Sequence, residues 1–248
     1  MILLSDLDKT LIFSHNCMSS DNYCVEYKGD KPLSYMTQAG ALKFKKISDH
    51  IKIIPVTARS REQYDRIKFP YEVKPDMAVI CNGADILINS KIDPHWHDIS
   101  ARIAAECDNE FSKSRQLLES ISDRYFDIRI VDGAFLFTKC HNSKQIQQLL
   151  MNTVHNLETD VLTNGDKLYV IPKKINKGLA VDRIRQMYHD EVIIAAGDSL
   201  FDVSMLNKAD LAIICGNEIP NHLITNKNTI YGSDFDFVVD TICDKLHI

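Results

Sequence analysis

Short apolar runs recur along the chain, and segments with helical periodicity separate several of them. The runs comprise residues 2–4, 51–56, 77–81, 192–196 and 211–215. Each is far too short to cross a membrane as a helix and is consistent with a buried strand. Strands that alternate with helices along a sequence pack into a parallel sheet whose faces the helices cover. The chain is therefore predicted to have an α/β core built on a parallel sheet.

Capping signals indicate where the helices begin. Residues 38–48 have a helical pattern, and Thr37 precedes them as an N-cap residue. Ser60 is followed three residues later by Gln63, which is the spacing of a capping box at the start of a second helix. Residues 178–188 are predicted to form a third helix.

A β-hairpin is predicted directly after the first strand. Two short β-like runs between Tyr23 and Met36 flank Lys28-Gly29-Asp30-Lys31, a sequence typical of a tight turn. Such a hairpin could fold over the crevice in which the first strand ends.

The middle third of the chain has a different pattern, in which a helix precedes a β-hairpin and the unit then repeats in kind. The predicted elements are a helical region at 94–124, strands at 126–131 and 135–139, a helix at 143–156, and strands at 160–163 and 167–171. Asp132-Gly133 and Asn164-Gly165-Asp166 are the two predicted hairpin turns. We therefore expect a separate αββαββ module, an inserted α+β domain, at residues 89–172.

Two carboxylates end the first apolar run. Asp6 and Asp8 lie two residues apart, and the carboxyl end of a parallel strand is where ligand crevices form. Two carboxylates about 4 Å apart repel by roughly 4 kcal/mol at the effective dielectric constant of a protein surface. A hard divalent cation such as Mg²⁺ would relieve this repulsion. The structural alternative for an isolated Asp-x-Asp is a turn or a helix N-cap.

Further polar residues follow the other predicted strands. Thr57 closes one strand, Lys177 precedes a helix, and Asp198 and Asp202 follow the run 192–196. A hydroxyl donor, a cation and further acids at the same sheet edge are what phosphoryl transfer requires. Taken singly, each has a simpler explanation: a turn threonine, a solvated lysine, and a capped helix start.

Composition narrows the classes of function. The 248 residues are 45% hydrophobic, which is enough for a full core, and their net charge of −5 comes without a Lys/Arg run of the kind that binds nucleic acid. No apolar run reaches the length of a membrane helix. The seven cysteines show no Cys-x-x-Cys spacing, so we expect reduced thiols and a cytoplasmic protein with neither a disulfide framework nor a zinc site.

In this order and spacing, the motifs resemble those of the haloacid dehalogenase superfamily. The match consists of Asp6-Leu7-Asp8-Lys9-Thr10, Thr57, Lys177, and Asp198 with Asp202. The resemblance implies a Rossmann-like, doubly wound core at 1–88 and 173–248. The insertion at 89–172 looks like the C2-type cap of the subgroup that contains Cof-type sugar phosphatases, sucrose-phosphate phosphatases and eukaryotic phosphomannomutases. Asn82-Gly83-Ala84 and Gly216-Asn217 are also similar to that subgroup.

The resemblance assigns different roles to the two acids of the first motif. Asp6 would attack phosphorus and form an aspartyl-phosphate, and Asp8 would act as general acid and then as general base. An acid at position 8 implies a phosphatase or phosphomutase, because the dehalogenases and P-type ATPases of the superfamily lack it.

The remaining motif residues would bind the metal and the phosphoryl group. The implied Mg²⁺ ligands are the Asp6 carboxylate, the Asp8 backbone carbonyl, Asp198, and Asp202 either as a ligand or as a partner of one. Thr57 and Lys177 would hold the phosphoryl group and offset its charge in the transition state.

Substrate contacts and two departures from the family pattern remain. Arg59, Asn82, Lys139, His141 and Lys167 are candidate substrate-binding residues. Arg59 could instead only pair with an acid. Lys9 stands where most relatives with a cap have Gly, and Phe201 stands where the sugar phosphatases commonly have Asn.

These inferences lead to one expected function and two alternatives. We expect a cytoplasmic, Mg²⁺-dependent phosphatase that acts on a small phosphorylated metabolite, such as a sugar phosphate, with no nucleic-acid or membrane partner. The alternatives are a phosphomutase with the same acids, and a non-catalytic metabolite-binding module.

Overall fold

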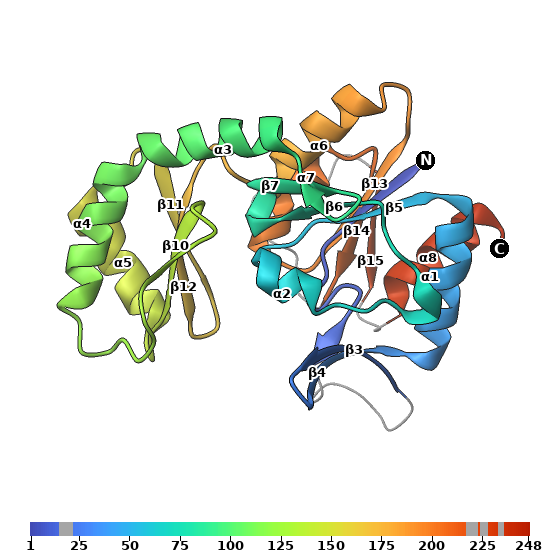
Figure 1. Cartoon of the computed structure of the whole chain (residues 1–248), viewed down its shortest axis with the longest axis horizontal. Helices are drawn as coiled ribbons and strands as arrows, with labels where there is room; N and C mark the ends of the chain where they lie inside the picture. The colour runs from blue at the N-terminus through green and yellow to red at the C-terminus, as the bar shows by residue number, and fades with distance from the viewer. Residues whose placement is uncertain (15–21, 217–222, 224–227, 233–235) are drawn as a thin grey trace. The chain divides into compact units, whose positions relative to one another are not determined.

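The computed structural model describes residues 1–14, 22–216, 223, 228–232 and 236–248 (Figure 1). The chain forms two compact units, one of residues 1–92 with 177–248 and one of residues 93–176. Each boundary lies four residues beyond the 88/89 and 172/173 positions expected from the sequence. Among the described residues, no helix combines the length and apolarity needed to cross a membrane.

A five-stranded parallel sheet forms the centre of the first unit, in the order β15-β14-β13-β1-β5. Its strands are β1 (Ile2–Ser5), β5 (Lys52–Pro55), β13 (Ile193–Gly197), β14 (Leu211–Cys215) and β15 (Asn228–Gly232). Leu4 in β1 is level with Ile54 on one side and with Ala195 on the other. The predicted α/β fold with a parallel sheet is confirmed, and the carboxyl ends of β1, β5 and β13 meet at one edge.

Helices cover both faces of this sheet, as in a doubly wound fold (Figure 1). On one face, α1 (Gln38–His50) and α8 (Phe237–Leu246) pack onto strand residues such as Leu3 and Ile194. On the other, α6 (Lys177–Met187) packs against α7 (Val203–Lys208), which contacts β13 and β14. Thr37 caps α1 as predicted, because its Oγ1 accepts a hydrogen bond of 2.8 Å from Gly40 N.

The predicted hairpin lies between β1 and α1. It consists of β3 (Asn22–Lys28) and β4 (Lys31–Thr37), and β2 (Phe13–Ser14) pairs with β4. Gly29 takes the left-handed conformation that the turn requires (φ +59°). The register of β3 shifts on both sides of Glu26, which is the mark of a β-bulge.

The apolar run 77–81 forms a strand, but not one of the central sheet. Strand β6 (Met77–Ile80) pairs antiparallel with β7 (Asp85–Ile88), which pairs with β8 (Lys91–Ile92). The reason is the tight turn η3 (Cys81–Gly83), in which Cys81 and Asn82 both have positive φ and reverse the chain. A single parallel bridge, Val56 to Val79, links β6 to the segment that follows β5.

The segment between β5 and β6 contains two short helices, α2 (Arg61–Asp65) and η2 (Pro70–Glu72). The capping box predicted for Ser60 and Gln63 is present at the start of α2.

The second unit contains the predicted helix and hairpin pairs. Its elements are α3 (Pro94–Glu106), α4 (Asp108–Glu119), β9 (Arg129–Val131), β10 (Phe135–Lys139), α5 (Ser143–Val154), β11 (Thr159–Asn164) and β12 (Lys167–Pro172). The strands form an antiparallel sheet in the order β11-β12-β10-β9. The region predicted as one helix is two, because the chain leaves helical geometry at Cys107 (φ −97°, ψ 1°). Leu118, Leu136 and Leu150 belong to a core cluster of this unit.

Candidate active site

Asp6 stands at the carboxyl end of β1, where the central sheet meets its loops. Its backbone N donates to Ala196 O of β13 at 2.9 Å, and Val56 N donates to Ser5 O at 2.8 Å. These bonds extend the parallel pairing to the last residues of the strands, so the side chain that follows each strand emerges at the same edge. Asp6 is only 5% exposed there.

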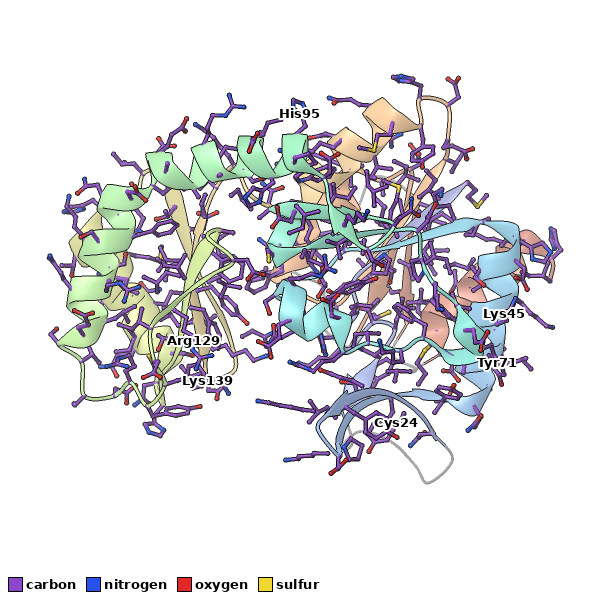
Figure 2. All side chains as sticks on the ribbon, in the orientation of Figure 1. Cys24, Lys45, Tyr71, His95, Arg129 and Lys139 are labelled. Carbon is purple, nitrogen blue, oxygen red and sulfur yellow. The ribbon has the colours of Figure 1, made fainter. Side chains whose placement is uncertain are left out.

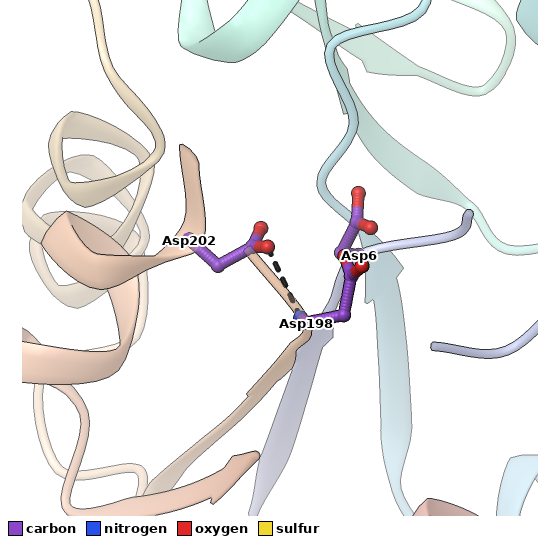
Figure 3. Close-up of side chains that lie close together, drawn as sticks. All are labelled: Asp6, Asp198 and Asp202. Atoms are coloured by element: carbon purple, nitrogen blue, oxygen red, sulfur yellow. Dashed lines mark hydrogen bonds between the residues drawn. The ribbon is translucent and has the colours of Figure 1, made fainter. Parts of the chain in front are cut away.

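Three carboxylates meet at this edge (Figure 3). One oxygen each of Asp6, Asp198 and Asp202 lies within 4.8 Å of the others. Asp202 ends η4 (Leu200–Asp202), and its Oδ2 accepts from Asp198 N at 3.2 Å, Ser199 N at 3.0 Å and Ser199 Oγ at 2.8 Å. Gly197 is needed here, because a Cβ atom at that position would lie 2.4 Å from Asp202 Cβ.

Lys177 connects two of these acids. Its Nζ donates to Asp6 Oδ1 and to Asp202 Oδ1, each at 2.6 Å, and the side chain is buried. The simpler explanation for Lys177, a solvated surface lysine, is therefore wrong. Gly178 allows this arrangement, because a Cβ atom there would lie 2.6 Å from Ser204 O of α7.

Burial and charge shift the pKa values of this cluster in consistent directions. Burial raises the pKa of Asp6 well above its ordinary value, the Lys177 cation opposes this, and the neighbouring acids add to it. Burial, reinforced by Asp202, raises the pKa of Asp198 to about 6. Burial disfavours the charged form of Lys177, but Asp202 and Asp6 outweigh it and raise the Lys177 pKa. One ammonium group thus faces three carboxylates, and the negative charge exceeds the positive.

The donor set suits a hard divalent cation. Carboxylate oxygens are the ligands that Mg²⁺ prefers, and an added positive charge would offset the excess of acids. Both oxygens of Asp202 already accept hydrogen bonds from protein donors, Oδ1 from Lys177 and Oδ2 from the 198–199 segment. Asp6 and Asp198 are therefore the better candidates for direct ligands, and Asp202 is better suited to orienting Lys177 and Asp198.

Thr57 lies in the turn after β5 and is buried. Its backbone N donates to Val79 O and its backbone O accepts from Asn82 N, each at 2.9 Å. Its Oγ1 accepts from Arg59 N at 3.2 Å, and its own hydroxyl proton remains available for a further acceptor. Asn82, a candidate substrate-binding residue, thus supports the Thr57 turn through its backbone.

Asp8 is held by Arg59 rather than by the acidic cluster. Arg59 Nε donates to Asp8 Oδ2 and Nη2 to Asp8 Oδ1, both at 2.8 Å. Arg59 also contacts Glu26 of β3, which is 2% exposed. Burial disfavours the charged form of Arg59, but the hydrogen bonds and charges of Asp8 and Glu26 outweigh it and raise the Arg59 pKa. The sequence carried no signal for Glu26, because an isolated Glu in a β-like run is ordinarily on the surface.

The other candidate substrate-binding residues lie in the second unit. Lys139 ends β10 opposite Lys167, the first residue of β12, and its Nζ lies 3.1 Å from Asp166 Oδ2 (Lys139 is labelled in Figure 2). The His141 ring stacks on Tyr125 with the ring centroids 4.5 Å apart. These residues gather at one end of the sheet of the second unit, and their contact with a substrate stays a prediction.

The two residues that depart from the family pattern, Lys9 and Phe201, differ in their surroundings. Lys9 is exposed and has a positive φ of 62°, a conformation that glycine adopts without strain. Phe201 is buried, with 8% of its surface exposed. Asn217 lies outside the described residues.

Comparison with known proteins identifies the family. Residues 106–242, more than half of the chain, match the family of haloacid dehalogenase-like hydrolases. The chain belongs to this family. The matched segment contains Lys177, Asp198 and Asp202, whereas Asp6, Asp8 and Thr57 precede it. Comparison with curated proteins found no match.

Solved structures of similar fold cover nearly the whole haloacid dehalogenase-like chain. The sucrose-phosphatase of Synechocystis sp. has 16% identity and a TM-score of 0.63 over 98% of this chain and 97% of that one. A haloacid dehalogenase-like hydrolase of Bacillus subtilis has 15% identity and a TM-score of 0.57 over 99% and 91%. The trehalose-6-phosphate phosphatase of Aspergillus fumigatus has 14% identity and a TM-score of 0.52 over 100% and 92%. The shared fold includes both the core and the inserted α+β unit.

Proposed function

We propose that this protein is a Mg²⁺-dependent phosphatase that hydrolyses a small phosphomonoester through an aspartyl-phosphate on Asp6. The observation that carries the proposal is the buried contact of Asp6 with Lys177, beside Asp198 and Asp202, at the carboxyl end of a parallel sheet. The family supports hydrolysis as the reaction class.

In the first step, an Asp6 carboxylate oxygen would form a bond to phosphorus while the bond from phosphorus to the ester oxygen breaks. Asp8 would give its proton to the departing oxygen, so that an alcohol leaves. In the second step, Asp8 would take a proton from water as the water oxygen attacks phosphorus. The bond to Asp6 then breaks, releasing inorganic phosphate and restoring the carboxylate.

The remaining residues would stabilise charge. Lys177 Nζ donates to a carboxylate oxygen of Asp6 and would therefore lie close to the phosphoryl oxygens during transfer. Thr57 would donate its hydroxyl proton to one of these phosphoryl oxygens. Asp6 and Asp198, with the Asp8 backbone carbonyl, would hold Mg²⁺, and Asp202 would orient the cluster. When bound, Mg²⁺ supplies positive charge that offsets the carboxylates and the transferring phosphoryl group.

The substrate class and cellular location belong to the same proposal. Sucrose-phosphate and trehalose-6-phosphate phosphatases among the structures of similar fold support a sugar phosphate or a related metabolite. Candidate contacts to the leaving group are Lys139, His141 and Lys167 of the second unit. None of the six described cysteines forms a disulfide, which supports a reducing compartment such as the cytoplasm.

The test is release of inorganic phosphate from a panel of phosphomonoesters, with and without Mg²⁺, together with acid-quench trapping of the phosphoenzyme. We expect Mg²⁺-dependent turnover of at least one sugar phosphate, and loss of both turnover and phosphoenzyme in Asp6→Asn. Conversion to an isomer that requires a bisphosphate primer, without phosphate release, would identify a phosphomutase. If no panel member is turned over and no phosphoenzyme is trapped, the proposal is refuted and the protein is a non-catalytic binding module.

A further inference from the structure

A chain of alternating charges links the exposed Asp8 to the interior of the β3–β4 hairpin. Asp8 contacts Arg59, Arg59 contacts Glu26, and Glu26 also contacts Arg66. We propose that Arg59 is a positioning residue that fixes the Asp8 carboxylate for proton transfer, and that buried Glu26 fixes Arg59. This inference rests on the proposed function, because it assigns a role relative to the Asp8 general acid and base.

The backbone of Arg59 is anchored to the catalytic edge. Arg59 N donates to Thr57 Oγ1 at 3.2 Å, and Arg59 O accepts from Cys81 N at 2.9 Å. Its side chain is 12% exposed, so the aliphatic stem is enclosed. The turn that carries the Thr57 hydroxyl group therefore also carries Arg59, and these hydrogen bonds fix the two residues relative to each other.

Glu26 is built into the hairpin as an anchor. The β-bulge around Glu26 changes the strand register there and lets a carboxylate occupy an interior position. Ser34 Oγ on the paired strand donates to Glu26 Oε2 at 2.6 Å, and Arg66 Nε donates to Oε1 at 3.1 Å. A carboxylate that is 2% exposed and has three cationic or hydroxyl partners is fixed in place.

The hydrogen bonds of Arg59 favour positioning over substrate binding. Nε and Nη2 form a fork on Asp8, while Nη2 and Nη1 contact Glu26 Oε2 and Oε1, each at 3.0 Å. All three nitrogens of the guanidinium group thus face protein carboxylates, which leaves little of its donor edge for a substrate phosphate. Arg59 therefore acts on the reaction through Asp8.

Asp8 requires such support because it is exposed. Its side chain is 55% exposed, and an exposed carboxylate exchanges among rotamers unless a partner holds it. A general acid must lie within hydrogen-bond distance of the atom that it protonates. The planar fork of Arg59 restricts both carboxylate oxygens at once, which a lysine ammonium group cannot do.

The test compares two substrates that differ in their need for a proton. Nitrophenolate leaves phosphorus readily without protonation, whereas an alkoxide does not, so the probes are p-nitrophenyl phosphate and the best alkyl phosphate of the panel. The parameter is kcat/KM, which reports steps up to leaving-group release. We expect Arg59→Lys to lower it about 10- to 100-fold for the alkyl phosphate and less than about threefold for p-nitrophenyl phosphate.

Two further variants distinguish positioning from general damage. Arg61→Lys is the matched control, because Arg61 lies two residues away and pairs with Asp65 and Ser90 O, and we expect no change with either probe. In the Asp8→Asn background, Arg59→Lys should have no further effect on the alkyl phosphate, since the two residues act as one unit.

Glu26→Gln tests the anchor. It should reproduce the substrate-selective loss of Arg59→Lys, and the double variant should be no worse than Arg59→Lys alone. Circular dichroism shows whether each variant is folded. If Glu26→Gln does not fold, Arg59→Lys still tests whether Arg59 positions Asp8.

The outcomes separate this inference from the function on which it rests. Equal losses with both probes in Arg59→Lys, or a further loss in the Asp8→Asn background, would overturn the positioning role while the phosphatase stands. No turnover of any panel member by the unaltered protein would overturn the proposed function and this inference together.

Discussion

At the scale of single residues, the candidate site consists of oppositely charged side chains that are paired with one another and buried. Lys177 Nζ lies 2.6 Å from an oxygen of Asp6 and 2.6 Å from an oxygen of Asp202, and all three side chains are buried. Buried ion pairs add little net stability when both partners are present, but loss of one partner leaves a charge without compensation. Lys177 therefore has a structural role in addition to the catalytic role that we propose for it.

Replacement of Lys177 should reveal both roles. We expect Lys177→Met to lower the free energy of unfolding by about 3–5 kcal/mol at pH 7, measured by urea denaturation, and to abolish phosphoenzyme formation. The loss should become smaller as the pH is lowered, because the raised pKa of Asp6 favours its neutral form, which needs no cationic partner. Lys43→Met, which removes an exposed pair with Asp240, is the control and should cost less than about 1 kcal/mol. Equal losses in the two variants would contradict this account.

Asp8 offers a second prediction at this scale. With p-nitrophenyl phosphate, Asp8→Asn should still form the aspartyl-phosphate, because the leaving group needs no proton. Its hydrolysis should slow by about 10²- to 10⁴-fold, since no base then activates water. Stopped-flow absorbance should show a burst of nitrophenolate followed by a slow phase. A single slow phase without phosphoenzyme would argue against separate roles for Asp6 and Asp8.

At the scale of elements, the position of each functional group depends on how closely the backbones approach. Helix α6 carries Lys177 at its first position, and Gly178 lets α6 lie against α7, with Gly178 N donating to Ser204 Oγ at 2.9 Å. The hairpin β3–β4 similarly brings Glu26 to Arg59 through its bulge. Gly178 and the β-bulge thus determine where the charged groups of Lys177 and Glu26 lie.

Gly178→Ala tests this close approach. The added Cβ atom would lie 2.6 Å from Ser204 O, so the backbone of α6 must shift. We expect a loss of about 1–3 kcal/mol in urea denaturation and a fall in kcat of about 10- to 100-fold as Lys177 moves. Gln186→Ala, on the exposed side of α6, should change neither quantity appreciably. Unaltered kcat in Gly178→Ala would show that the position of Lys177 tolerates the shift.

At the scale of the whole molecule, the excess of acidic groups at the candidate site should make stability depend on pH and on divalent metal ions. The pKa of Asp198 rises from 3.8 to about 6 in the folded protein, and that of Asp6 is raised as well. Between these pH values Asp198 and Asp6 hold more protons in the folded state than in the unfolded state. The contribution of these two groups to the stability of the metal-free protein should therefore fall as the pH rises from about 4 to about 6.

Mg²⁺ should reverse this loss above pH 6. At a concentration 100 times its Kd, a ligand adds about 2.7 kcal/mol, or about 5–10 °C in Tm for a chain of this size. We expect such a shift at pH 7 by differential scanning calorimetry, and a much smaller one at pH 4. Asp198→Asn should weaken both the pH dependence and the response to Mg²⁺. Equal Tm values with and without Mg²⁺ at pH 7 would argue against the metal site.

Several elements could be predicted because their causes are local. Periodicity and the Thr37 and Ser60 caps predicted α1 and the start of α2, and the Gly-containing turns predicted the hairpins. The run 77–81 was predicted as a buried strand, which is confirmed, but its antiparallel pairing outside the central sheet was not predicted. An apolar run shows that a strand is buried, not which strand it pairs with, and the turn dipeptide Asn82-Gly83 was not used to predict the reversal there.

By itself, the sequence determined which residues follow the strands, and the parallel topology then places Asp6, Thr57 and Asp198 at one edge. The tertiary structure alone decided what each side chain contacts. Asp6 and Lys177 are 171 positions apart, and both oxygens of Asp202 are taken up by protein donors that the sequence did not indicate. The link from Asp8 through Arg59 to Glu26 depends on a β-bulge. Strand ends follow from local patterns, whereas these contacts depend on the close packing of segments that are distant in sequence.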